Sequence, residues 1–168
     1  NIKFIWNTQG NTLVNQHGGV NQIREILEDE KLVETIVVVD NQMTPSARFA
    51  DYVLPDTMNQ EIDDMQGDAY AVGEYNYIVA CPKAADILWE QKPNYWIMTE
   101  IAKRFGLEEK FTEGRTQKEW IRWGYEQTLA KAAKQPDPIK LPGFDEFWAK
   151  GFVKYHMGRD SGIVLKAF

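Results

Sequence analysis

The feature that most constrains the fold of this chain is a run of four β-branched residues at positions 36–39, Ile-Val-Val-Val, which ends at Asp40. A short run that is apolar on both faces is typical of a parallel strand buried on both sides. Two further apolar strands are predicted at residues 1–6 and 52–54, and a helical pattern begins at Asn21. Strand, helix and strand in this order predict a parallel pair with a right-handed crossover. We therefore expect an α/β fold with a Rossmann-like parallel sheet and flanking helices.

Polar residues follow the predicted strands. Asp40 and Asn41 come after the central strand and favour a turn, and Thr44 before a proline predicts the start of a short helix over residues 46–50. Residues 7–12, Asn-Thr-Gln-Gly-Asn-Thr, form a polar loop after the first strand. Ligands of open α/β sheets bind at the carboxyl ends of the strands. The loop is therefore either a plain polar turn or a ligand-facing loop.

Asp51, just before the third strand, has two possible roles. Guanine presents two adjacent donors, N1–H and N2–H2, and the two oxygens of a carboxylate can accept both. Alternatively, Asp51 ties down the start of its own strand. The residues alone leave both roles open.

The remaining two thirds of the chain contain helices and an acidic segment. Residues 55–80 predict a long acidic loop with one strand at 75–79, and amphipathic helices are predicted at 95–105, 117–134 and 144–150. Thr116 is the expected N-cap of the second of these helices, with Glu119 completing a capping box. We expect residues 1–134 to form one α/β domain. Residues 135–168 should form a proline-containing linker, a short helix, and a hairpin or lead into another domain.

Composition and missing motifs exclude several functions. The chain has 168 residues and a net charge of −6, which argues against binding nucleic acid. No GxGxxG or GxxxxGK[ST] motif is present, and neither a catalytic nucleophile nor a metal site is predicted from one cysteine and two separated histidines. No apolar run approaches the roughly 18 residues that a membrane span requires. The pattern indicates binding, with no catalytic or metal-ligating residue.

The run Thr44-x-Ser46-Ala47-x-x-Ala50-Asp51-x-Val53-Leu54-Pro55 resembles a signature of the molybdopterin-dependent oxidoreductases of the dimethyl sulfoxide reductase superfamily. Residues 4–17, 101–106, 111–120, 144–147 and 166–168 are similar to the catalytic A subunits of the anaerobic dimethyl sulfoxide reductases. The resemblance covers nearly the whole chain and is weakest in the acidic segment and at residues 135–142.

The resemblance implies an incomplete fragment of a larger multidomain subunit that reduces S-oxides or N-oxides. Its cofactor would be molybdenum held by two molybdopterin guanine dinucleotides, with an iron–sulfur cluster only in an N-terminal region that this chain does not contain. The expected partners are the rest of the catalytic subunit, an iron–sulfur electron-transfer subunit and a membrane anchor subunit, at the periplasmic face of the bacterial inner membrane. The expected cofactor-binding residues are Asn7, Gln9, Gly10, Asn11, Asp40, Asn41, Thr44 and Asp51.

Two alternatives remain open. The first is another enzyme of the superfamily, such as a selenate reductase or a formate dehydrogenase-like protein. The second is a stand-alone module that binds a nucleotide or a partner protein. The isolated chain is expected to be inactive under the main hypothesis, because the molybdenum ligand of the superfamily would lie outside it.

Overall fold

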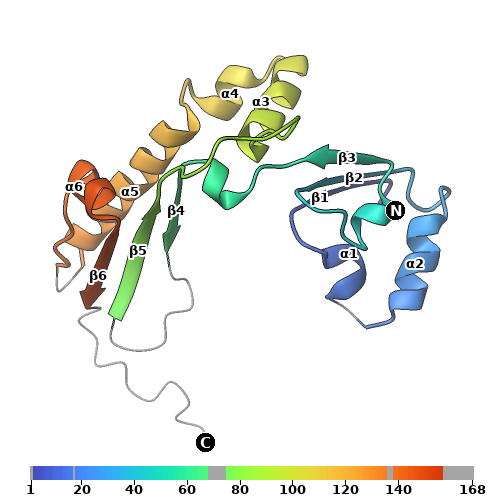
Figure 1. Ribbon diagram of the computed structural model, residues 1–168, viewed down its shortest axis with the longest axis horizontal. Coiled ribbons are helices and arrows are strands. Elements are labelled where there is room, and N and C mark those ends of the chain that lie inside the picture. The colour runs from blue at the N-terminus through green and yellow to red at the C-terminus, as the bar shows by residue number, and fades with distance from the viewer. Residues whose placement is uncertain (1, 17, 68–74, 136–137, 157–168) are drawn as a thin grey trace, which may run out of the picture. The chain divides into compact units, whose positions relative to one another are not determined.

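The computed structural model describes residues 2–16, 18–67, 75–135 and 138–156, and the chain divides into two compact units (Figure 1). Unit 1 contains residues 1–58 and 86–108, and unit 2 contains residues 59–85 and 109–168. The expected boundary after residue 134 does not coincide with this division. The reason is that the C-terminal strand pairs with a strand from the middle of the chain, which places both in unit 2.

Unit 1 is built on a three-stranded parallel sheet in the order β1-β2-β3. The strands are β1 (Phe4–Thr8), β2 (Thr35–Asp40) and β3 (Tyr52–Pro55). Ile5 pairs with Ile36, and Val38 pairs with Val53. The predicted parallel α/β arrangement is confirmed. However, β1 ends two residues later than expected, so Asn7 and Thr8 belong to the strand.

One face of this sheet is covered by the short connecting elements, α1 (Thr12–Asn15), α2 (Val20–Glu28) and the single 3-10 turn η1 (Ala47–Phe49) (Figure 1). Val38 is fully buried there, with Leu13 and Leu27 packed nearby. Helix α2 begins one residue before Asn21, where the sequence predicted the start of a helical pattern. Gly19 is the N-cap of α2 at φ 77°, a left-handed conformation that glycine adopts without a steric penalty.

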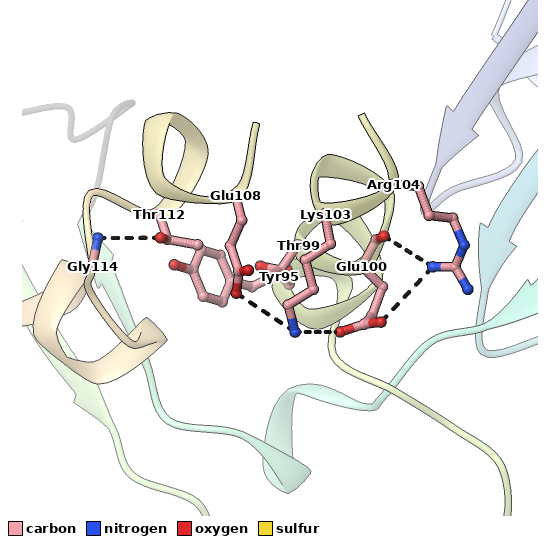
Figure 2. Close-up of polar contacts among 8 residues, drawn as sticks. All are labelled: Tyr95, Thr99, Glu100, Lys103, Arg104, Glu108, Thr112 and Gly114. Carbon is pink, nitrogen blue, oxygen red and sulfur yellow. Dashed lines mark hydrogen bonds and ion pairs between the residues drawn. The ribbon is translucent and has the colours of Figure 1, made fainter. Parts of the chain in front are cut away.

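Helix α3 (Asn94–Arg104) completes the described part of unit 1, close to the predicted range of 95–105. Figure 2 shows Lys103 of this helix, whose Nζ lies 2.7 Å from Glu100 Oε1 and 3.5 Å from Glu108 Oε1. The hydrogen bond that the Lys103 ammonium donates to Glu100 is the main cause of the raised pKa of Lys103. The hydroxyl of Thr99 also donates to the carbonyl oxygen of Tyr95 within the helix. These contacts fix the outer surface of α3.

Unit 2 contains an antiparallel sheet in the order β4-β5-β6, which the sequence did not predict as a sheet. The strands are β4 (Asp64–Gly67), β5 (Tyr75–Cys81) and β6 (Phe152–His156). The expected strand at 75–79 is confirmed, whereas part of the presumed acidic loop is strand β4. The remainder of that segment, residues 68–74, lies outside the described residues, as does the tail from residue 157. The expected hairpin after residue 151 is therefore described only as β6, which pairs with β5.

Two helices of unit 2, α5 (Gln117–Ala133) and α6 (Phe144–Lys150), follow the sequence prediction closely. The one-turn α4 (Glu108–Thr112), which begins at the unit boundary, and the 3-10 turn η2 (Asn59–Glu61) were not predicted. The capping box of Thr116 and Glu119 at the start of α5 is confirmed. Tyr125 and Phe147 are fully buried and stack with ring centroids 4.3 Å apart. The aromatic residues of α5 are only partly in the core, because Tyr125 is buried while Trp123 is exposed.

Asp63, just before β4, contacts two other segments of unit 2. Its Oδ1 accepts from the backbone N–H of Lys83, and its Oδ2 lies 3.1 Å from Nζ of Lys118 at the start of α5. Partial burial raises the pKa of Asp63, but these two contacts outweigh burial and hold it below its ordinary value. Among the described residues, no helix has both the length and the apolar character needed to cross a membrane.

Candidate functional site

Polar residues follow all three parallel strands of unit 1 at the same edge of the sheet. Residues 9–11 follow β1, Asn41 follows Asp40 at the end of β2, and Asp56 and Thr57 follow β3. Parallel strands present their carboxyl ends at one edge, so these groups are brought together by the sheet. We call this the carboxyl edge of unit 1.

The loop after β1 is held in an unusual backbone conformation. Gln9 and Gly10 are consecutive left-handed residues, with φ 52° and φ 82°. The side chain of Asn7, 8% exposed, is used inside the loop: Nδ2 donates to the carbonyl oxygen of Gly10 at 3.2 Å, and Oδ1 accepts from the hydroxyl of Thr12. Asn7 therefore fixes the loop from within, while Gln9 and Gly10 are exposed.

A second set of hydrogen bonds joins this loop to the connection after β2. Asn11 Oδ1 accepts from both the backbone N–H of Ser46 at 2.8 Å and its hydroxyl at 2.7 Å. The hydroxyl of Ser46, which is fully buried, accepts in turn from the N–H of Leu13. Thr44 Oγ1 accepts from the N–H of Ala47 at 3.2 Å, which starts the 3-10 turn as the sequence predicted for a helix. The two loops are therefore fixed relative to each other before any ligand binds.

Two buried carboxylates lie at the carboxyl edge, and they differ in how fully they are bonded. Asp56 is 1% exposed, and both of its oxygens have partners: Gln9 Nε2 donates to Oδ2 at 2.9 Å, and the N–H of Thr57 donates to Oδ1 at 2.8 Å. Asp40 is 8% exposed; its Oδ1 accepts from the N–H of Gln42, while its Oδ2 is buried with no hydrogen-bond partner. Of these two carboxylates, only Asp40 has an oxygen without a hydrogen-bond partner among the described residues.

Asp51 does not lie at this edge. It precedes β3, and in a parallel sheet the residue before a strand stands at the amino edge, next to the start of β2. Its Oδ2 accepts from the N–H of Ile36 at 2.7 Å, and its own N–H donates to the carbonyl oxygen of Ile36 at 2.9 Å. The placement of Asp51 with the ligand-facing residues is therefore corrected. The carboxylate makes the strand tie that the sequence left as an alternative.

The other seven predicted residues lie in β1, in β2 or in the loops that follow these strands at the carboxyl edge. The sequence analysis overlooked Asp56 and Thr57, although both directly follow a predicted strand, which was a usable signal. It also overlooked Gln91 and Lys92. The N–H of Lys92 donates to the carbonyl oxygen of Pro55 at 3.0 Å, and Lys92 forms a parallel bridge with Asp56. A single bridge made by a loop leaves no periodic pattern in the sequence.

Within the described ranges, no group of three or more histidine, cysteine, aspartate or glutamate residues is arranged to hold a metal. Gln9 and Gly10 are exposed residues, but the N–H of Gln9 donates to the carbonyl oxygen of Val39 at 2.8 Å and the carbonyl oxygen of Gly10 accepts from Asn7. Asp40 Oδ2 is an acceptor without a partner among the described residues.

Comparisons with known proteins agree with the resemblance read from the sequence. Residues 1–104 match the sequence profile of the family described as molybdopterin oxidoreductase. Over 99% of its length the chain is 45% identical to the putative dimethyl sulfoxide reductase chain YnfE and 41% identical to the dimethyl sulfoxide reductase DmsA, both of Escherichia coli (strain K12). A dimethyl sulfoxide/trimethylamine N-oxide reductase of Rhodobacter capsulatus is 35% identical over 92% of the chain and 18% of that protein.

The chain covers 20% of each of the two Escherichia coli relatives, so it spans about a fifth of their length. Among solved structures, acetylene hydratase from Pelobacter acetylenicus matches with a TM-score of 0.57 at 21% identity, over 92% of this chain and 18% of the other. At this level of identity the match concerns the fold alone.

Proposed function

This chain belongs to the molybdopterin oxidoreductase family, and on that premise we propose that the carboxyl edge of unit 1 holds the guanosine end of a molybdopterin guanine dinucleotide. The observation that carries the proposal is the buried Asp40, whose Oδ2 has no hydrogen-bond partner among the described residues. Guanine offers N1–H and N2–H2 on one edge, and a carboxylate oxygen is the acceptor that such donors require. A hydrogen bond to a charged acceptor contributes roughly 1.5–3 kcal/mol when it is sheltered from water.

The loops around Asp40 would orient the ligand. The Asn11–Ser46 hydrogen bonds fix the loops after β1 and β2, so binding does not have to order them first. The backbone at Gln9 and Gly10 is exposed beside the strand end, and Asn41 is exposed next to Asp40. These residues would bind the nucleoside and exclude water from it. When bound, the cofactor supplies two-electron oxygen-atom transfer chemistry at its molybdenum, to which no described residue of this chain is assigned.

The proposal is tested by exchanging one carboxylate at a time in the full-length protein. Asp40→Asn keeps the shape of the side chain but replaces one acceptor oxygen with a donor, which faces the donors of guanine. We expect the content of guanine nucleotide and molybdenum per protein to fall, as measured by nucleotide chromatography after acid release and by elemental analysis.

Asp51→Asn is the matched control, because it makes the same substitution at the opposite edge of the same sheet. We expect it to leave the cofactor content of the folded protein unchanged. The proposal fails if Asp51→Asn removes the cofactor while Asp40→Asn does not.

For the whole enzyme we propose reduction of S-oxides or N-oxides, supported by relatives named as dimethyl sulfoxide and trimethylamine N-oxide reductases. Oxidation of a reduced dye by the full-length protein should be faster with dimethyl sulfoxide or trimethylamine N-oxide than with selenate. A formate- or selenate-specific activity would instead favour another branch of the superfamily. Tight binding of GDP by the 168-residue chain alone would favour a stand-alone nucleotide-binding module.

We also propose that the catalytic subunit works with an iron–sulfur electron-transfer subunit and a membrane anchor at the periplasmic face of the inner membrane. The support is the resemblance to the anaerobic reductases, together with a relative named as one chain of a reductase. Co-purification of the full-length protein with both subunits from a periplasm-facing membrane fraction tests it.

A further inference from the structure

Four buried side-chain oxygens of the described residues have no hydrogen-bond partner, and all four belong to unit 1. They are Asp40 Oδ2, Thr57 Oγ1, Gln91 Oε1 and Asn94 Oδ1. Buried polar atoms of folded proteins are nearly always hydrogen-bonded, because leaving one without a partner costs stability. Asp40 and Thr57 are 8% and 2% exposed, so bulk water has little access to their side chains as a hydrogen-bond partner.

The topology of unit 1 brings three of the four residues to the carboxyl edge. Asp40 pairs with Pro55 at the end of β3, and Pro55 accepts from the N–H of Lys92. The bridge between Asp56 and Lys92 therefore adds residues 91–93 beside β3. Thr57 directly follows one member of this bridge, and Gln91 directly precedes the other. Asn94, at the start of α3, lies two residues after Lys92 in the chain.

The fully bonded Asp56 shows that burial at this edge does not by itself leave oxygens unpaired. Its two oxygens accept from the side chain of Gln9 and from the N–H of Thr57. The exposed fraction of Asp56 is 1%, lower than the 8% of Asp40 and the 2% of Thr57. The atoms without a partner thus belong to particular side chains on segments that pair with or adjoin Asp56. Such a distribution is expected where the partners of these atoms come from outside the described residues.

The chemistry of these atoms selects the kind of ligand group. Two amide oxygens, a carboxylate oxygen and a hydroxyl attract hydrogen-bond donors, whereas phosphate oxygens would be repelled by the carboxylate. A nucleoside offers such donors as base N–H groups and ribose hydroxyls. The set therefore fits the nucleoside end of the dinucleotide and not its pyrophosphate.

We infer that Thr57 and Gln91, on the segments that meet at the Asp56–Lys92 bridge, hold the nucleoside of the cofactor together with Asp40. This inference rests on the proposed function and extends it to a segment, residues 91–94, that lies outside the motif of residues 44–55. These residues position the ligand by accepting hydrogen bonds from it. Asn94 is placed to add a further acceptor at the start of α3.

Near-isosteric apolar substitutions test the inference, because removing an unpaired buried oxygen has opposite effects with and without the ligand. Thr57→Val and Gln91→Met are made in the full-length protein, with Gln22→Met on the exposed surface of α2 as the matched control. Release of guanine nucleotide from the loaded protein should become about 2-fold to 10-fold faster for each variant, as expected for one lost neutral hydrogen bond. The melting temperature of cofactor-free protein, made in cells that cannot synthesise the cofactor, should stay the same or rise. The control should change neither measurement.

Two results overturn the inference. Unchanged release from both variants means that the two side chains do not touch the nucleoside. A lower melting temperature of the cofactor-free variants means that another part of the protein provides the partners. Asp40→Asn distinguishes the two levels: if it speeds release while Thr57→Val and Gln91→Met do not, only this inference fails. If Asp40→Asn has no effect either, the proposed function fails as well.

Discussion

Replacing Asp51 with alanine is expected to destabilise unit 1 by about 2 kcal/mol, because the carboxylate ties together the starts of β2 and β3. Asp51 Oδ2 accepts from the N–H of Ile36 at 2.7 Å, and Ile36 is 2% exposed. A hydrogen bond to a charged group contributes roughly 1.5–3 kcal/mol, and an unsatisfied buried N–H costs a similar amount. We take the lower half of this range because Asp51 itself is exposed to solvent, which partly replaces the lost partner.

Amide hydrogen exchange in the 168-residue chain measures this loss at the site itself. A change of 2 kcal/mol corresponds to about 30-fold faster exchange of amides that open only with the whole unit, such as that of Val38. The amide of Ile36 should lose at least as much protection. Asp51→Asn keeps one acceptor oxygen without the charge, so its effect should be about half as large in free energy. Glu25→Ala, which removes an exposed carboxylate of α2, controls for the change in net charge.

The reasoning about Asp51 is refuted if Val38 and Ile36 exchange at the same rate in the parent chain and in Asp51→Ala. If full-length Asp51→Ala loses guanine nucleotide while amide exchange is unchanged, Asp51 binds the cofactor and does not stabilise the sheet. A loss of stability without a specific loss of cofactor from the folded protein would agree with the structure.

Two further predictions concern unit 2. Partial burial raises the pKa of Asp63, but a backbone N–H and the Lys118 ammonium outweigh it and lower the pKa, so this contact stabilises the fold above the ordinary aspartate pKa. This stability should be lost as the pH falls from the ordinary aspartate pKa through the lowered pKa of Asp63. Urea titrations of Asp63→Asn should show a flatter acid dependence, and equal slopes would contradict this. Tyr125→Phe removes the 2.9 Å hydrogen bond to the carbonyl oxygen of Pro142 and should lower the unfolding free energy by about 1 kcal/mol. A variant as stable as the parent in urea would show that the hydroxyl contributes nothing.

Local chemistry allowed much of the secondary structure to be predicted. The β-branched run at 36–39 has no alternative to a buried strand, and the Thr116–Glu119 capping box is complete within four residues of sequence. Helices α3, α5 and α6 carry their own periodicity and stop signals. The polar loops after β1 and β2 were also found, because strand ends and turn residues are local features.

Pairings between distant segments could not be predicted. Strand β4 is polar and short, and only its pairing with β5 makes it a strand. Because β6 pairs with β5, the boundary between the units differs from the one expected after residue 134. The bridge between Asp56 and Lys92 places residues 91–93, which the sequence analysis overlooked, at the carboxyl edge.

The sequence by itself determined that this chain contains a parallel α/β sheet, that polar loops follow its first two strands, and which family it belongs to, because motif, strand and helix signals all lie within short stretches. Only the tertiary structure decided which acid lies at the carboxyl edge of the sheet and which at its amino edge. Asp40 and Asp51 have the same side chain, but Asp40 is the last residue of β2 and Asp51 directly precedes β3. In a parallel sheet these positions are at opposite edges, so Asp51 bonds to Ile36 while Asp40 keeps an open oxygen.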